Sequence, residues 1–403
     1  MTPPPPAPSP VREPRAQERG SDISRSTLSG ESPEAQWSEE TSEHHLSPVT
    51  RHLSPVTLEA AFRPRRGTTL LFAACAAALS LALLLGVSAG AVSIPTEAVL
   101  RLLLSRVFPI AAEYPDTFTT ILFAIRLPRV MLMALTGAAL ATAGAAYQGL
   151  FRNPLADPYL VGVASGAGLG ATLVITFGLP ATGLGLLAVP LGAFLGGVIT
   201  VGLVVMMAQV GRTTPVTTLL LAGVAAGSFA TAITTFWMLR SPEGLRRALN
   251  WLLGGYAGGG WEPVLITLPY LLLGLLVLQV NARALNVLQL DEEQARQLGL
   301  NVERLKLILV GAATLMTAAA VAFGGLIGFV GLIVPHVLRI FGGPDHRRLI
   351  PLSALGGAAF LILADLIART IFAPQELPVG VITALVGAPF FIVLLRRIKR
   401  AVF

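Results

Sequence analysis

Long apolar segments separated by short polar stretches fill the chain from Thr68 onwards. Each is about 20 residues long, the length that an α-helix needs to cross the hydrocarbon core of a bilayer. The strands of a membrane β-barrel would be about ten residues long and would alternate apolar with polar positions. We therefore expect an all-α, polytopic membrane protein with about ten transmembrane helices. The predicted spans are Thr68–Ile94, Leu127–Leu150, Tyr159–Leu179, Gly183–Val210, Pro215–Leu239, Pro263–Ala282, Leu305–Phe323, Ile327–Phe341, Leu349–Phe372 and Val379–Leu395.

Composition supports this class. Hydrophobic residues make up 54% of the chain and charged residues 13%, about half the charged fraction of a soluble domain. The arginines stand at the ends of apolar segments rather than in one cluster, so the net charge of +7 indicates membrane topology and no nucleic-acid partner. The single cysteine, Cys75, excludes an intrachain disulfide and a thiol-based metal cluster, and we predict no metal site.

The distribution of basic residues predicts the orientation. If the N-terminus is cytoplasmic, the cytoplasmic ends of the spans carry more arginine and lysine than the outer ends, as in known membrane proteins. Both termini are then cytoplasmic. Residues 1–66 are rich in Pro, Ser, Glu and Arg and cannot bury a core. We expect a disordered cytoplasmic N-terminal extension there and a transmembrane domain over residues 67–403.

One charged stretch, Asp291–Lys306, interrupts the apolar pattern and must lie outside the hydrocarbon, where ionised groups keep their hydration. Asp291 can cap a short helix with two glutamates in its first turn, Gly299 can end that helix, and Asn301 can cap the next. The pattern favours a folded docking element at residues 288–306. The alternative is a solvated loop on the membrane surface.

Several kinds of chemistry are missing. The chain has no G-x-x-x-x-G-K-[ST] loop, so it cannot bind ATP phosphates in the usual way, and any ATP hydrolysis belongs to another subunit. Asp365 is the main ionisable residue within a span, and Arg369 lies one helical turn later, where an i,i+4 salt bridge is expected. A proton relay would need more such groups. Glycines at every fourth position indicate close helix packing; these are Gly162, Gly166 and Gly170, and then Gly192 and Gly196.

Four stretches of the chain resemble the permease subunits of binding-protein-dependent ABC importers for iron–siderophore, haem and cobalamin, the FecCD family. They are RLPR at Arg126–Arg129, GAAYQGLFRNPLADPYLVGVASGAGLG at Gly144–Gly170, GFVGLIVPHVLR at Gly328–Arg339, and ADLIART with ELPVGVITALVGAPFF at Ala364–Thr370 and Glu376–Phe391. The resemblance covers nearly all of Thr68 to Arg400.

The resemblance implies a type II ABC importer permease fold in the cell inner (plasma) membrane. It implies two ATP-binding subunits that hold ATP and Mg, a periplasmic or extracellular substrate-binding protein, and a second permease subunit. We expect a homodimer and leave a heterodimer open. No cofactor is expected on this chain, which is not itself an enzyme.

The resemblance also assigns residues. The coupling element that docks on the ATPase corresponds to Asp291, Glu292, Glu293, Arg296, Leu298 and Gly299. The binding protein would dock on Arg126, Arg129 and Arg369, and we expect charge reversal at Arg126 or Arg129 to weaken docking without disturbing the fold. The cytoplasmic gate corresponds to Asn153, Leu155, Val216 and Thr217. For Asn153 the residues equally favour a cap of the tight turn that contains Pro154.

The function expected from the resemblance is import of an iron(III)–siderophore complex, with haem or cobalamin as alternatives. Two hypotheses that assign the chain to other classes of protein remain. An ion-coupled secondary transporter would use broken helices with carboxylates near the midplane, and the chain offers little beyond Asp365. A structural or receptor protein could use Asp291–Lys306 only as an anchor, but this leaves the outer arginines unexplained.

Overall fold

The computed structural model describes residues 66–90, 92, 94–106, 108, 114–178, 187–255 and 259–402. They belong to one compact unit, Arg63–Phe403. Apart from Arg66, the predicted disordered extension at residues 1–66 lies outside the described residues. Within the described ranges the regular elements are helices, and the β-structure is a single bridge between Val210 and Thr213. The all-α prediction is confirmed.

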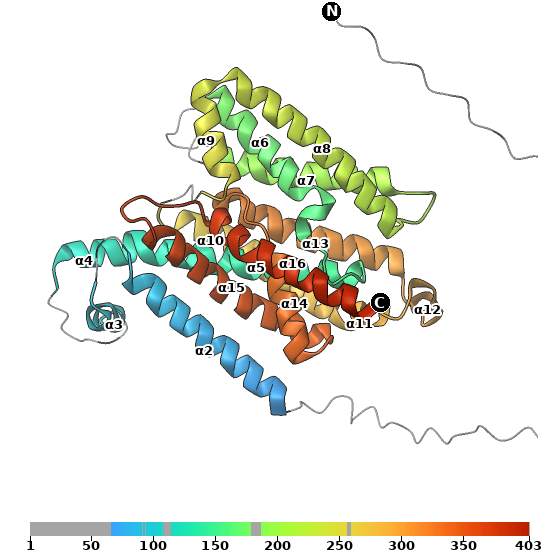
Figure 1. Cartoon of the computed structure of the whole chain (residues 1–403), viewed down its shortest axis with the longest axis horizontal. Helices are drawn as coiled ribbons and strands as arrows, with labels where there is room; N and C mark the ends of the chain where they lie inside the picture. The colour runs from blue at the N-terminus through green and yellow to red at the C-terminus, as the bar shows by residue number, and fades with distance from the viewer. Residues whose placement is uncertain are drawn as a thin grey trace, which may run out of the picture. The chain divides into compact units, whose positions relative to one another are not determined.

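Ten apolar helices correspond to the ten predicted spans (Figure 1). Seven apolar helical segments of the described chain are long enough to cross a bilayer, whereas α6, α14 and the described apolar part of α16 are shorter. The count of ten spans therefore stays a prediction. The helices are α2 (Arg66–Ser88), α5 (Leu127–Leu150), α6 (Val163–Phe177), α7 (Ala188–Ala208), α8 (Val216–Arg240), α10 (Glu262–Val280), α13 (Val302–Gly324), α14 (Val330–Gly342), α15 (His346–Thr370) and α16 (Val379–Val402).

Shorter helices connect these spans, and one of them lengthens α5. A π-helix, η1, joins α4 to α5 without a break, so the helix begins at Asp116 rather than at the predicted Leu127. Pro128, the second residue of α5, lacks the N–H of a regular α-helical ladder, and wider π turns are tolerated at such a place. The connecting elements are α3 (Thr96–Leu104), α4 (Asp116–Thr120), η1 (Ile121–Arg126), η2 (Pro158–Val161), α9 (Pro242–Leu252), α11 (Ala282–Leu288) and α12 (Glu292–Gln297).

Helices α5 and α13 form the centre of the packing, and α5 contacts α13, α14 and α15. Helices α6, α7 and α8 pack on one another. The predicted glycine contacts are confirmed between α6 and α7: a Cβ on Gly166 would lie 2.4 Å from the Gly196 carbonyl oxygen, and one on Gly170 would lie 1.9 Å from that of Gly192. Backbones approach this closely only where side chains are absent.

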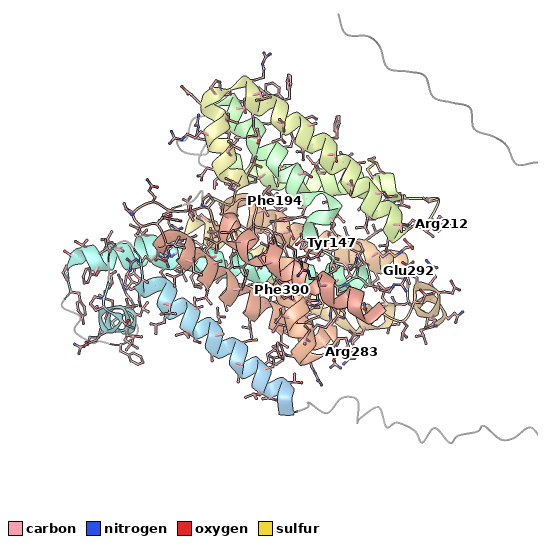
Figure 2. All side chains as sticks on the ribbon, viewed as in Figure 1. Tyr147, Phe194, Arg212, Arg283, Glu292 and Phe390 are labelled. Carbon is pink, nitrogen blue, oxygen red and sulfur yellow. The ribbon has the colours of Figure 1, made fainter. Side chains whose placement is uncertain are left out.

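The long helix α5 separates two polar regions of the molecule. It has 24 residues and therefore spans about 36 Å. Helix α4 lies beyond the N-terminal end of α5, and α12 lies near the C-terminal end of α5 (Figure 1). We call these two regions the α4 end and the α12 end. Arg212, Arg283 and Glu292 all lie at the α12 end (Figure 2).

Candidate functional site

The charged stretch at the α12 end is folded as the sequence predicts. Helix α12 spans Glu292–Gln297, and Asp291 stands at its N-cap position but makes no side-chain capping hydrogen bond there. Gly299 follows with a φ of 84°, in the left-handed region that glycine adopts without strain. The side chain of Asn301 accepts a hydrogen bond from the backbone N–H of Arg304 at 3.0 Å and so caps α13. The stretch therefore forms helix rather than the alternative solvated loop, and its docking role stays a prediction.

Helix α12 is anchored on one side and exposed on the other. Ala295 is fully buried, whereas Leu298 is 67% exposed and the Glu293 side chain 67%. Arg296 lies within 3.5 Å of three carboxylates, those of Glu292, Glu293 and Glu303. The predicted coupling residues thus lie together, and they present both charged and apolar groups to a partner.

The residue that precedes the first predicted gate segment contacts the N-cap residue of α12. Arg152 Nη1 donates a hydrogen bond to Asp291 Oδ1 at 2.7 Å, and this contact holds the pKa of the Asp291 carboxyl below its ordinary value. The pair therefore persists at neutral pH and is lost as acid protonates Asp291. Arg152 has a φ of 49°, which is uncommon for a residue other than glycine. It precedes Asn153, whose Oδ1 accepts the backbone N–H of Leu155 at 2.9 Å.

The turn-capping interpretation of Asn153 is therefore confirmed, and its role in gating stays a prediction. The second gate segment, Val216 and Thr217, forms the first two residues of α8. Val216 is partly buried and Thr217 is exposed. Sequence reasoning left out Arg152, although its place directly before Asn153 in the tight turn was a usable signal.

At the α4 end, two of the three predicted docking arginines are buried against the end of α2. Arg126 is 5% exposed and donates to the carbonyl oxygens of Val87 at 3.1 Å and Ser88 at 2.7 Å, and also to that of Val92. Arg369 is 6% exposed and donates to the Gly86 carbonyl oxygen. Both guanidinium groups satisfy backbone oxygens that have no partner within α2.

Asp365 contacts both Arg129 and Arg369. Its Oδ1 accepts hydrogen bonds from Nε and Nη2 of Arg129 at 3.1 and 2.9 Å. Its Oδ2 lies 3.5 Å from Nε of Arg369, which confirms the predicted i,i+4 pair. Glu376, which sequence reasoning left out, contacts Nη1 of Arg129 at 2.8 Å with its side chain 53% exposed.

These contacts correct one expectation about docking. Charge reversal at Arg126 cannot leave the fold undisturbed, because the new carboxylate would face the buried carbonyl oxygens of α2. Arg129, with its side chain 12% exposed beside Glu376, offers more surface than the other two arginines. Docking at all three stays a prediction.

A hollow of about 680 Å³ lies between the start of α6 and α8. Small and hydroxyl-bearing residues line it, among them Ser165, Ser228, Thr231 and Thr235. Gly223 lies close to η2, since a Cβ there would be 2.3 Å from the Leu160 carbonyl oxygen. The walls carry no ionised side chain among these residues, so they can contact a solute without binding it strongly.

Comparison with known proteins places the chain in a family. The FecCD transport family matches residues 78–397. The uncharacterised ABC transporter permease YvrB of Bacillus subtilis is 44% identical over 325 residues, which are 80% of this chain and 92% of the relative. The cobalamin import system permease BtuC of Halobacterium salinarum is 48% identical over 288 residues, 72% of this chain and 76% of the relative.

A solved structure extends the match to the fold. It shows an inward-facing conformation of a metal-chelate type ABC transporter, with a TM-score of 0.71 and 31% identity. The alignment covers 82% of this chain and 99% of that chain. Family, relatives and fold agree with the resemblance found in the sequence: this integral membrane protein belongs to the FecCD transport family of ABC importer permeases.

Proposed function

We propose that this chain is the permease subunit of a binding-protein-dependent importer that carries an iron(III)–siderophore complex across the inner membrane. Cobalamin and haem are the alternative substrates. Two separate subunits would bind ATP and Mg and hydrolyse the ATP, and a second permease chain would complete the pathway. The α12 end would face the cytoplasm, together with both termini.

The observation that carries this proposal is the position of α12. An exposed helix with a buried anchor at Ala295 lies beside Arg152, which precedes the first gate segment, and close to the loop that leads into α8. A partner that binds the exposed side of α12 can therefore act on the helices through short contacts.

The hollow beside α8 supports a bulky, weakly held substrate. Its lining of glycine, serine, threonine and apolar residues offers hydroxyl groups without a fixed charge, which suits a metal chelate that must leave the pathway again. The relative from Halobacterium salinarum is named for cobalamin and the solved structure for a metal chelate. A siderophore complex belongs to the same chemical class.

The ion-coupled alternative loses its main candidate residue. Asp365 is the carboxylate that a proton relay would use, and in the structure it contacts both Arg129 and Arg369. Both contacts are ion pairs that engage the carboxylate inside the protein, which is the role of a structural residue. Its place at the α4 end, rather than halfway along the span, also differs from the site expected in such transporters.

Reversing the charge of Glu293 tests the docking role of α12. Glu293→Lys should weaken copurification of the ATP-binding subunits with the chain about tenfold, because the exposed helix would present the wrong charge to its partner. Glu97→Lys is the matched control. Glu97 is also exposed and pairs with an arginine, Arg101, on the same helix, but it lies on α3. Equal binding by both variants would contradict docking through α12.

A further inference from the structure

A buried lysine lies behind the coupling helix. Lys306, in the second turn of α13, is 3% exposed. Its Nζ donates to Glu292 Oε2 at 2.8 Å, to Glu303 Oε1 at 3.3 Å and to the carbonyl oxygen of Thr214 at 3.0 Å. These three partners come from α12, α13 and the loop between α7 and α8. One ammonium group therefore joins α12 and α13 to a loop residue that lies 92 positions earlier in the sequence.

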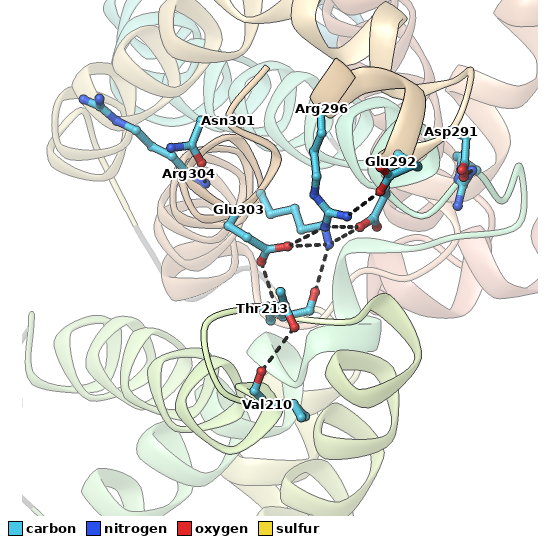
Figure 3. Close-up of polar contacts among 12 residues, drawn as sticks. Val210, Thr213, Asp291, Glu292, Arg296, Asn301, Glu303 and Arg304 are labelled. Atoms are coloured by element: carbon cyan, nitrogen blue, oxygen red, sulfur yellow. Dashed lines mark hydrogen bonds and ion pairs between the residues drawn. The ribbon is translucent and has the colours of Figure 1, made fainter. Parts of the chain in front are cut away.

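The same carboxylates complete the cluster. Glu303 Oε2 accepts the backbone N–H of Thr214 at 2.7 Å. Arg296 Nη2 lies 3.4 Å from both Glu292 and Glu303. Figure 3 shows Glu292, Arg296 and Glu303 facing one another beside Thr213 and Val210 of the α7–α8 loop. Lys306 and Arg296 balance the charges of Glu292 and Glu303, as partial burial requires. The exposed Glu293 adds a third carboxylate 3.5 Å from Arg296.

Both polar backbone groups of Thr214 are thus fixed by side chains of the coupling region, the N–H by Glu303 and the carbonyl by Lys306. Thr214 itself is buried. Only Pro215, whose ring restricts the backbone, separates it from Val216 at the start of α8. The loop therefore cannot move away from α12 and α13 unless charged hydrogen bonds break.

We propose that Lys306, with Glu292 and Glu303, forms a rigid joint that transmits the displacement of α12 to Val216 and Thr217 at the gate. Lys306 is a positioning residue that acts through Thr214 and does not touch the transported molecule. The Arg152–Asp291 pair is a second connection from α12, to the first gate segment, but its side chains are 41% and 48% exposed. Solvent weakens that pair, so the buried joint transmits the larger share of the movement.

The inference rests on the proposed function, and uptake per ATP hydrolysed tests it. In liposomes that contain the complete importer, Lys306→Met should lower the number of substrate molecules imported per ATP about tenfold. The ATP-binding subunits should still copurify and hydrolyse ATP. Lys399→Met removes the only other lysine of the chain. It is not part of the proposed joint, and its substitution should change the ratio less than twofold.

A distance measurement does not depend on the folding of the Lys306 variant. Spin labels at Arg212→Cys in the loop and Gln297→Cys on α12, both exposed positions, would be placed in a Cys75→Ala background, which removes the single native cysteine. If the joint is rigid, the distance between the two spin labels has a narrow distribution. ATP binding leaves this distance unchanged although the importer changes conformation. A distance that changes with ATP in the otherwise native chain would overturn the joint.

The outcomes separate the two hypotheses. If the unaltered chain shows no ATP-dependent uptake, the proposed function fails before the joint is tested. If the unaltered chain imports substrate and Lys306→Met keeps the same uptake per ATP, the proposed function stands and the joint is wrong. A folded Lys306→Met complex that hydrolyses ATP with little uptake, combined with the unchanged distance in the native background, supports the joint.

Discussion

Asp365→Asn is expected to destabilise the folded chain by about 3 kcal/mol, because it removes a buried charge that two arginines share. The carboxylate is 1% exposed and lies within 3.5 Å of both Arg129 and Arg369. Without it, Arg369 retains the neutral carbonyl oxygen of Gly86, which cannot balance a buried guanidinium charge. Unfolding of the purified chain in detergent, followed by circular dichroism, measures the loss.

Glu376→Gln is the matched control for this variant. It also removes one carboxylate partner of Arg129, but the Glu376 side chain is 53% exposed, and an exposed pair contributes less than about 1 kcal/mol. We expect the two variants to differ clearly in unfolding midpoint. Equal shifts would show that Asp365 does not stabilise the α4 end, and would leave its arginines available for docking.

Gly144→Ala is expected to destabilise the folded chain as Asp365→Asn does. A Cβ on Gly144 would lie 1.9 Å from the carbonyl oxygen of Gly331 and 2.6 Å from its Cα. These are backbone atoms of α14, so no rotamer change can relieve the overlap, and α5 and α14 must separate. Overpacking of this kind costs about 1–3 kcal/mol or more, and we expect loss of monodisperse protein in size-exclusion chromatography.

Gly202→Ala is expected to have the opposite effect on the stability of the folded chain. Gly202 lies within α7, and a Cβ there would have no neighbour within 4 Å. Alanine has a higher helix propensity than glycine by about 1 kcal/mol, so this variant should be as stable as the native chain or more stable. If both alanine variants behave alike, the close approach of α5 and α14 does not exist in the folded protein.

Sequence reasoning predicted the helices well where apolar length decided the outcome. The predicted Leu127–Leu150 has the bounds of α5, and the caps at Gly299 and Asn301 follow from local backbone chemistry. It missed α3, α9 and α11, because short connecting helices have too few residues for a clear periodic pattern. It did not predict that α4 and η1 continue the second span back to Asp116.

Contacts between distant segments could not be predicted in the same way. The arginines at the α4 end were expected to face a partner protein, but Arg126 and Arg369 satisfy carbonyl oxygens of α2. Nothing local in the sequence indicates which carbonyl oxygens lack a partner. Similarly, Lys306 was predicted only as the last charged residue of the docking stretch, because its burial depends on the α7–α8 loop about 90 residues earlier.

ATP-driven uptake tests the central claim most directly. Liposomes would contain this chain, its ATP-binding subunits and the substrate-binding protein, and they would be supplied in turn with labelled iron(III)–siderophore, cobalamin and haem. We predict uptake of the iron(III)–siderophore complex only when ATP is present on the α12 side, and no uptake driven by a proton or sodium gradient alone. Uptake that follows an ion gradient without ATP would contradict the account, and ATP-dependent uptake of cobalamin or haem instead would change the substrate.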